Sequence, residues 1–429
     1  MRGLTAMKYN VALLHYSCPP VVGGVEEVIR QHASLLTRYY HNVKVFAGDG
    51  GQFDTGTEVE INPLLGSRNR EVLDVHQSGI EGRPEKMEAL TGRIYGYLLE
   101  ALRGFDLLIA HNVLTMPFNL PLSAALHRIG REGLIPIISW NHDSPYFYQD
   151  YPEHLDLFPW LILKRAYAGI HYVVISESRR EMFARLYGNR KRLYVIPNGI
   201  DPIRFFFLDK STVRFIQEQR LFEAEFLMVH PSRLHRRKNM ELSIRVTRCL
   251  RDLGLGARLL ITGAHDPHEP KSLTYYRELV DLAAELGIED HVMIMAEYIF
   301  ESGETLPADR ITIRDLYLIS DILFLPSLQE GFGIPLLESG MIKLPVVCSN
   351  IPPFREIGGE DVCFFDLNDS PDQVAAKILD FVGTLKPHRM FRRVIREYAW
   401  DNIYHERLFP LLERVIGTYR KPDDWAFRA

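Results

Sequence analysis

Residues 322–338 read ILFLPSLQEGFGIPLLE, and this stretch decides the fold class. Four apolar residues that end at Pro326 are typical of a strand buried on both faces of a sheet. Two glycines follow, and Pro335 suits the first turn of a helix, where its missing N–H is harmless. The stretch therefore predicts a buried strand, a glycine-containing loop and a helix, the repeating unit of an α/β protein with a parallel sheet.

The same alternation of apolar runs and helix-period segments extends along the whole chain. Six runs form a first series at 11–14, 43–46, 107–110, 135–138, 172–175 and 194–196. Six more form a second series at 226–229, 259–261, 292–294, 322–325, 346–347 and 362–365. The turn-forming segment Pro197–Pro202 separates them. We therefore expect two Rossmann-like, doubly wound parallel-sheet domains, with the boundary between residues 203 and 204.

Composition favours a cytoplasmic enzyme. The chain has 429 residues, 46% of them hydrophobic and 24% charged, which suits two globular domains. Its net charge of -5 argues against nucleic acid as a partner. The four cysteines are widely separated and are expected to be reduced thiols. Neither a secretory signal nor a membrane-spanning run is found, although attachment to a membrane surface is left open.

The loop and helix that begin at Glu330 have the features of an anion site. A helix N-terminus with glycines ahead of it offers N–H groups and a positive dipole end to an anion. Glu330 and Glu338 would lie roughly 12 Å apart if the whole segment were helical, so each could hold a different hydroxyl pair of an extended ligand. The alternative interpretation is an ordinary strand–loop–helix joint with two surface glutamates.

Two further segments suggest phosphate binding. Arg233 and Lys238 follow the strand that ends at Val229, and an arginine fork with a lysine ammonium suits a diphosphate, unless they belong to a solvated basic loop. Gly23 and Gly24 follow the first strand and open a helix. Their spacing lacks the G-x-G-x-x-G pattern of a dinucleotide site, which argues against a dehydrogenase.

Polar residues also follow two strands of the first series. His142 stands just past the run 135–138, where open parallel sheets bind ligands, and a catalytic role competes with a structural one. Four further residues are candidates for binding a second ligand, called the acceptor below: His111, Asn112, Asp143 and Tyr146. Residues 263–269 contain metal-type side chains without a recognisable ligand spacing, so no metal site is predicted.

Together these segments resemble glycosyltransferase family 4, the large group of retaining enzymes with the GT-B fold. The resemblance covers nearly the whole chain and is most specific in four segments: Gly23–Glu26, Val195–Asp201, Arg233–Asn239 and Pro326–Glu338. It implies two domains that face a central cleft, an acceptor-side domain of residues 1–203 and a nucleotide-sugar domain of residues 204–397. The amphipathic segment Tyr398–Gly417 would cross back to the first domain, which would then include residues 398–429.

The resemblance implies roles for matching positions. Glu330 would contact the donor sugar, Glu338 would hold the ribose hydroxyls, and His142 would lie near the donor sugar. The diphosphate would be neutralised by Arg233 and Lys238. Backbone groups would complete the donor site at Gly23, Gly24, Tyr298, Phe332, Gly333 and Ile334. Two departures from the family pattern are Lys343, where glycine is usual, and the segment Phe300–Thr312, which is longer than the common link.

The expected reaction moves a hexose, glucose or mannose, from a nucleoside diphosphate sugar to an acceptor hydroxyl with retention of configuration. No cofactor and no metal are expected, because cationic side chains can stabilise the leaving diphosphate. The acceptor class is a sugar, polyol, glycerate or lipid-linked molecule, and the protein is expected to be a monomer or homodimer. Alternatives are a non-catalytic nucleotide-sugar binding protein and a GT-B enzyme of another class, such as an epimerase.

Overall fold

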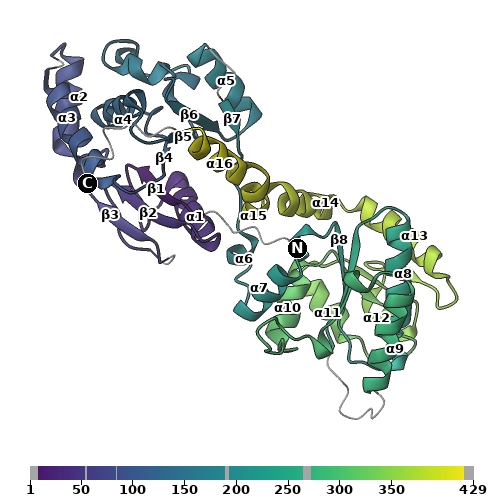
Figure 1. Ribbon diagram of the computed structural model, residues 1–429. Helices are drawn as coiled ribbons and strands as arrows, with labels where there is room; N and C mark the ends of the chain where they lie inside the picture. The colour runs from purple at the N-terminus through teal and green to yellow at the C-terminus, as the bar shows by residue number, and fades with distance from the viewer. Residues whose placement is uncertain (1–7, 54–55, 84, 189–192, 264–271, 420–429) are drawn as a thin grey trace. The chain divides into compact units, whose positions relative to one another are not determined.

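The computed structural model describes residues 8–53, 56–83, 85–188, 193–263 and 272–419. The chain divides into two compact units (Figure 1). The first unit extends to Ile200 and resumes at Tyr398, and the second comprises Asp201–Glu397. The expected boundary between residues 203 and 204 lies three positions after this division.

The first unit is built on a parallel sheet of seven strands in the order β3-β2-β1-β4-β5-β6-β7. The strands are β1 (Asn10–His15), β2 (Asn42–Ala47), β3 (Glu58–Ile61), β4 (Leu107–His111), β5 (Ile137–Asn141), β6 (Ile170–Val174) and β7 (Leu193–Val195). All six runs of the first series are confirmed as strands. The edge strand β3 was not predicted, because half of its residues are glutamates. Lys44 pairs with Glu58 at 2.6 Å and with Glu60 at 2.9 Å, which neutralises them.

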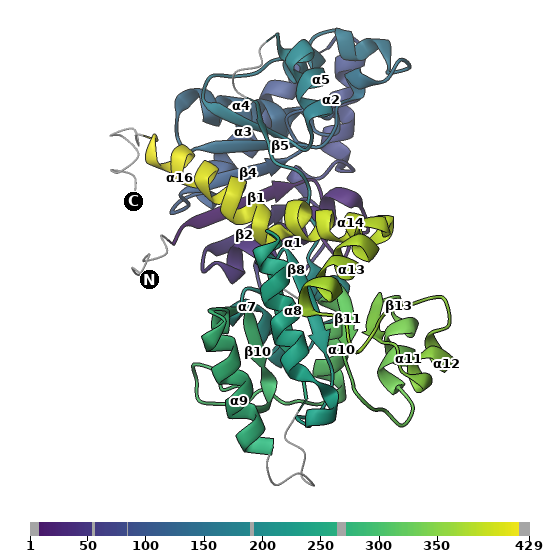
Figure 2. The same ribbon diagram turned by 90° about the vertical axis from the view of Figure 1, so that its right-hand side faces the viewer.

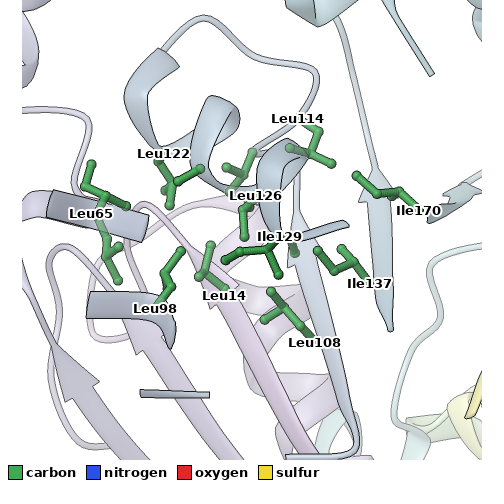
Figure 3. Packing of buried hydrophobic residues seen from close by; sticks show 14 of the residues in the cluster. Leu14, Leu65, Leu98, Leu108, Leu114, Leu122, Leu126, Ile129, Ile137 and Ile170 are labelled. Atoms are coloured by element: carbon green, nitrogen blue, oxygen red, sulfur yellow. The ribbon is translucent and has the colours of Figure 1, made fainter. Parts of the chain in front are cut away.

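Helices cover both faces of this sheet, namely α1 (Gly24–Arg38), α2 (Arg70–Ile80), α3 (Glu85–Ala101), α4 (Leu120–Glu132) and α5 (Glu177–Tyr187). Short 3-10 turns lie at Pro63–Leu65, Pro145–Phe147, Glu153–Asp156 and Trp160–Lys164. One apolar core lies between the sheet and α3 and α4 (Figure 3). There Leu14 and Leu108 of the strands pack with Leu98, Leu126 and Ile129 of the helices.

The segment after Tyr398 completes the opposite face of the first sheet. It consists of α15 (Trp400–Ile403), a π-helical turn (Tyr404–Leu408) and α16 (Phe409–Gly417). Its apolar face is buried and consists of Trp400, Ile403, Leu408, Leu411, Leu412 and Val415. They share a core with Val11, Leu13 and Ile29. Arg38 also donates to Asp401 at 2.8 Å. The predicted amphipathic segment is confirmed, with the π turn as an unforeseen interruption.

The second unit has a parallel sheet of six strands in the order β10-β9-β8-β11-β12-β13 (Figure 2). The strands are β8 (Phe226–His230), β9 (Ala257–Ile261), β10 (Val292–Ile294), β11 (Ile322–Leu325), β12 (Val346–Ser349) and β13 (Cys363–Phe365). All six runs of the second series are therefore confirmed. The helices are α6 (Pro202–Phe205), α7 (Lys210–Glu218), α8 (Met240–Asp252), α9 (Ser272–Glu285), α10 (Arg310–Ile319), α11 (Ile334–Met341), α12 (Pro352–Gly358), α13 (Pro371–Thr384) and α14 (Lys386–Arg393).

Both sheets share one winding pattern. The chain starts at a central strand, builds outward to one edge, and then returns to the other side of the starting strand. The direction reverses between β1 and β4 in the first sheet and between β8 and β11 in the second. Ligands of open α/β sheets bind outside the carboxyl ends of the strands at such a reversal. Each unit therefore has one favoured place for a ligand. None of the described helices has both the length and the apolar character to cross a bilayer.

Candidate functional site

The reversal point of the second sheet brings Lys238 and Glu330 together. Lys238 ends a 3-10 turn (Arg236–Lys238) after β8, and Glu330 lies in the loop after β11. Because β8 and β11 are neighbours, both loops leave the same edge of the sheet. The two side chains form an ion pair and are only 15% and 14% exposed. Ser327 also donates its hydroxyl to Oε1 of Glu330 at 2.9 Å. The two residues expected to serve diphosphate and sugar are thus in contact.

Short backbone contacts fix these two loops. The N–H of Leu328 donates to the carbonyl of Arg237 at 2.8 Å, which joins one loop to the other. Ser349, at the end of β12, donates to the carbonyl of Ser327 at 2.6 Å. Gly263 follows β9 and passes so close to the neighbouring loop that a Cβ there would lie 1.5 Å from the carbonyl oxygen of Ser232. Arg233 follows Ser232 in the chain. Its side chain is exposed, whereas its two neighbours in the sequence, Ser232 and Leu234, are buried.

The helix expected to face an anion is α11, with Pro335 in its first turn. Gly333 precedes it at a φ of 122°, which favours glycine. A Cβ at Gly333 would also lie 3.1 Å from the ring of Phe354. Its neighbours Phe332 and Ile334 are 55% and 59% exposed. Glu338 is exposed one turn further along, where it accepts a hydrogen bond from the hydroxyl of Tyr317 at 3.3 Å. Burial, and secondarily this carboxylate, raises the pKa of Tyr317.

Tyr298 uses its polar groups inside the second unit. Its hydroxyl donates to Glu218 and accepts from Gln219, both at 2.9 Å. Its backbone N–H donates to Met295 at 3.1 Å, and its carbonyl accepts from Leu306 at 3.2 Å. The contact from Leu306 comes from the segment 300–312, which turns back on itself through a bridge between residues 299 and 305. The structure thus gives Tyr298 a role in holding this segment.

In the first unit, the reversal point between β1 and β4 contains a hollow of about 550 Å³. Gly24 and Glu26 of α1 line it together with His15, Asn112 and Arg68. Gly23 lies just before the helix, and a Cβ there would meet the Glu26 carboxylate at 2.0 Å. That carboxylate accepts a hydrogen bond from Ser17 at 2.5 Å. Gly23 therefore makes room for Glu26 to turn back over the helix start.

His142 lies beside this hollow in a buried group of imidazoles. Its Nε2 is 3.3 Å from Nδ1 of His111, and Asn198 donates to its Nδ1 at 3.3 Å. A ring nitrogen that accepts leaves the proton of a neutral imidazole on the other nitrogen, so Nε2 of His142 donates to His111. Burial, with a smaller effect of His15, lowers the pKa of His142 to about 3. His142 is therefore neutral near pH 7, with both ring nitrogens engaged inside the protein.

The four acceptor candidates have different surroundings. Asn112 adopts a φ of 58° and lines the hollow, while its Oδ1 accepts from the N–H of His142 at 2.7 Å. Asp143 pairs with Arg179 at 3.2 Å and accepts from the hydroxyl of Tyr148 at 2.7 Å. The Tyr146 hydroxyl donates to the carbonyl of Leu155 at 2.6 Å. His111 is fully buried. Of the four candidates, only Asn112 is part of the hollow's lining.

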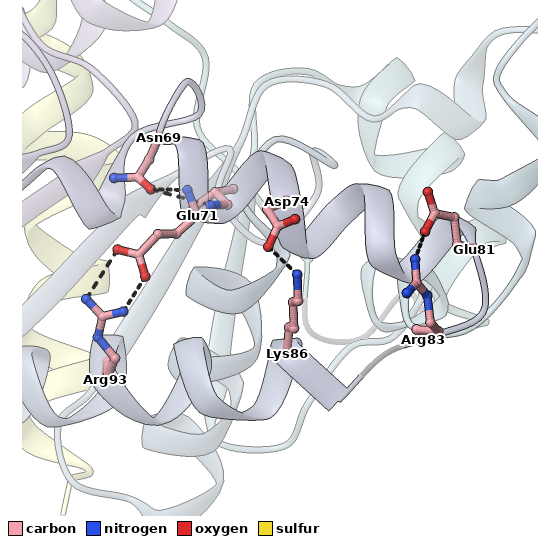
Figure 4. A network of polar contacts seen from close by, with 8 residues as sticks. Asn69, Glu71, Asp74, Glu81, Arg83, Lys86 and Arg93 are labelled. Atoms are coloured by element: carbon pink, nitrogen blue, oxygen red, sulfur yellow. Dashed lines mark hydrogen bonds and ion pairs between the residues drawn. The ribbon is translucent and has the colours of Figure 1, made fainter.

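Several residues of the hollow were not predicted from the sequence. They include His15, Asp49, Arg68 and Asn69, of which the last three lie in loops without an obvious motif. Asn69 caps α2 by accepting from the N–H of Glu71 at 2.8 Å (Figure 4). Ion pairs then join α2 to α3, including Lys86 with Asp74 at 2.6 Å. Each of these exposed pairs stabilises the fold only slightly. Together they orient α2, the helix that follows Arg68 and Asn69 in the chain.

No group of three or more potential metal-ligating side chains exists among the described residues. Residues 264–269, most of the segment considered for a metal and judged to lack ligand spacing, lie outside the described ranges.

Comparison with known proteins relates both units to sugar transfer. The family model "Glycosyltransferase Family 4" matches residues 22–204, and "Glycosyl transferases group 1" matches residues 212–397. An uncharacterised glycosyltransferase of Methanocaldococcus jannaschii is 26% identical over 416 residues, which are 92% of this chain and 96% of that protein. Mannosylglucosylglycerate synthase of Thermotoga maritima is 24% identical over 374 residues, or 81% of this chain and 82% of that enzyme.

Among solved structures, sucrose-phosphate synthase of Thermosynechococcus elongatus is similar over 96% of this chain and 100% of its own, at 16% identity and a TM-score of 0.40.

Proposed function

We propose, from the premise that this chain is a glycosyltransferase of family 4 with the GT-B fold, that it transfers a hexose from a nucleoside diphosphate sugar with retention of configuration. The observation that carries the proposal is the Lys238–Glu330 pair at the reversal point of the second sheet. A cation suited to a phosphate and a carboxylate suited to sugar hydroxyls are held side by side there, beside the start of α11.

Lys238 would contact both Glu330, which holds the donor sugar, and the phosphate that leaves it. An ammonium group has three donors, so it can contact Glu330 and a phosphate oxygen at once. Among the described residues, Lys238 and Ser327 donate to the Glu330 carboxylate, and both do so at Oε1. Oε2 would then accept hydrogen bonds from hydroxyls of the donor sugar. In this arrangement the ion pair sets the distance between the sugar and its leaving group.

The chemical step breaks the bond between the anomeric carbon and the diphosphate oxygen and forms a bond from that carbon to the acceptor oxygen. The acceptor proton passes to the leaving phosphate on the same face, so no protein nucleophile is used. Negative charge grows on the diphosphate as the bond breaks. Arg233, Lys238 and the N-terminus of α11 would stabilise this charge, which is usually the largest catalytic effect. We infer from these cations that no divalent metal is required.

The acceptor would be bound by the first unit. Its hollow of about 550 Å³ falls in the size range of small-molecule sites. Glu26 and Asp49 can accept hydrogen bonds from hydroxyls, which suits a polyhydroxylated acceptor such as a sugar, a polyol or a glycerate. Glucose or mannose is the proposed hexose, in keeping with the name of the relative mannosylglucosylglycerate synthase.

Thermal unfolding in the presence of UDP-, GDP- and ADP-hexoses would identify the donor, because a ligand that binds the native state raises Tm. Turnover of that donor with candidate acceptors, with and without a chelator, tests transfer and metal independence. Proton NMR of the first product tests retention. A donor that binds but is never consumed would favour a non-catalytic binding protein. Consumption without an acceptor would favour an epimerase or a hydrolase.

A further inference from the structure

A second cavity lies at the amino edge of the second sheet. It has a volume of about 440 Å³ and lies between the start of β8, the end of α13 and α14. Phe226, the first residue of β8, lines it. The loops that carry Arg233 and Lys238 leave the other end of the same strand, roughly 13 Å away at about 3.3 Å per residue. The cavity is therefore separate from the proposed donor site.

Four arginines line this cavity. Arg389, Arg392, Arg393 and Arg396 recur at intervals of three and four residues, which places them along one side of a helical segment. Like charges at this spacing repel one another and destabilise a helix. The positive charge is thus concentrated on a wall of the cavity.

Only part of this positive charge forms ion pairs that stabilise the folded protein. Asp321 is fully buried below the cavity, where Arg392 and His388 both contact its carboxylate. Arg389 and Arg393 have no side-chain hydrogen bond or ion pair among the described residues. The cavity also contains Glu225, whose carboxylate accepts from the N–H of Gly256 at 2.8 Å. At least two arginines therefore face this cavity beyond what Asp321 requires.

The remaining lining is apolar, from Phe226, Leu255, Ile378, Leu379 and Val382. A cavity of this volume accepts a small organic molecule, and arginine forks match phosphate oxygens. We propose that this cavity binds a phosphate ester, with the phosphate on Arg389 and Arg393 and the organic part against the apolar lining. The ester could be carried by a small metabolite or by a phospholipid headgroup, which share this chemistry.

Isothermal titration with phenyl phosphate and with inorganic phosphate, at constant ionic strength, tests the site in the full-length protein. We expect phenyl phosphate to bind at least tenfold more tightly than inorganic phosphate, because only the ester has an apolar part. The double variant Arg389→Gln/Arg393→Gln should lose at least tenfold of this affinity while its Arg392–Asp321 contact keeps it folded, as circular dichroism would verify.

Two controls separate this site from general charge and from the donor site. Arg245→Gln/Arg310→Gln removes two other exposed arginines of the second unit, and should leave phenyl phosphate binding unchanged. Lys238→Gln removes a phosphate contact of the proposed donor site, so phenyl phosphate binding that persists in this variant is assigned to the second cavity. Equal affinity for the two phosphates, or an equal loss in either control, would overturn the proposal.

Flotation with phosphatidylcholine vesicles, with and without phosphatidic acid, identifies the source of the ester. Arginine-dependent flotation with phosphatidic acid supports a lipid headgroup. Phenyl phosphate binding without flotation supports a soluble metabolite.

Discussion

Lys238 and Glu330, 92 positions apart in the chain, form an ion pair at the carboxyl edge of the second sheet. If this pair positions the donor, Lys238→Gln and Glu330→Gln should each lower kcat/KM on the order of 100- to 1000-fold. The double variant should be little worse than the poorer single variant, because residues that act as a unit are not additive. Arg236→Gln on the same turn, where Arg236 pairs with Glu278, is the control and should retain activity. Steady-state kinetics with independent, multiplicative losses would contradict the coupling.

Gly263 allows the close passage of two loops, so Gly263→Ala should displace the loop that carries Arg233. A Cβ would lie 1.5 Å from a backbone oxygen, and that oxygen cannot rotate away as a side chain could. We expect a loss of about 1–3 kcal/mol in the free energy of unfolding, together with weaker donor binding. Urea denaturation and donor titration measure the two effects. Gly96→Ala, in α3 and with open space around it, should stabilise the protein instead.

Lys343 occupies a turn position where the family resemblance predicts glycine, and its φ of 61° is left-handed. The turn therefore keeps the backbone conformation that glycine favours, at a steric cost to lysine of about 1–2 kcal/mol. Lys343→Gly should raise the free energy of unfolding by roughly 0.5–1 kcal/mol after the added flexibility of the unfolded chain is subtracted. Denaturant midpoints measure this gain. A lower midpoint would mean that the lysine side chain makes a stabilising contact that outweighs its backbone strain.

Asp321 is completely buried and receives Arg392, His388 and the N–H of Leu227. Asp321→Asn removes the charge and leaves buried Arg392 without its partner, so we expect a loss of about 3–5 kcal/mol. Chemical denaturation followed by circular dichroism measures this loss. Asp74→Asn breaks an ion pair with Lys86 that is more than half exposed on both sides, and should have far less effect. Equal effects would show that burial does not govern the Asp321 contact.

His32 is fully buried against Trp140, Trp400 and His111, and neither ring nitrogen has a hydrogen-bond partner within the described part of the chain. Burial, with a smaller effect of His142, lowers its pKa to about 3. Between this value and about 6.5 the unfolded chain binds a proton that the folded chain does not, so stability falls as pH falls. His32→Phe should remove this loss, which is about 2 kcal/mol between pH 8 and pH 5. Denaturation at pH 8 and pH 5 measures it, and identical pH slopes in the two proteins would contradict the assignment.

Twelve of the described strands could be predicted from the sequence, because each is a nearly continuous apolar run between turn residues. β3 was missed because the sequence Glu58-Val-Glu-Ile61 belongs to an edge strand whose charges face solvent and Lys44. The meeting of Lys238 and Glu330 could also be foreseen, since both follow the carboxyl ends of predicted strands.

The contacts of other side chains could not be assigned from the sequence, because it does not show which distant residues the fold brings beside them. Asp143 turns to Arg179 of α5, and Tyr146 turns to the backbone of Leu155. Arg68 and Asn69 reach the first hollow only because the loop after β3 returns to the start of α1.

Because residues 400–415 return to the first unit, the two units cannot finish folding in the order in which the ribosome synthesises them. Synthesis proceeds from the N-terminus at about 5–20 residues per second, and domains fold as units when their residues have emerged. Asp201–Glu397 is continuous and can complete its core as soon as it is released. The first unit, although made earlier, lacks Trp400, Leu408 and Leu412 until just over 200 further residues have been translated, about 10–40 s later. The half that is synthesised first is therefore the half that finishes folding last.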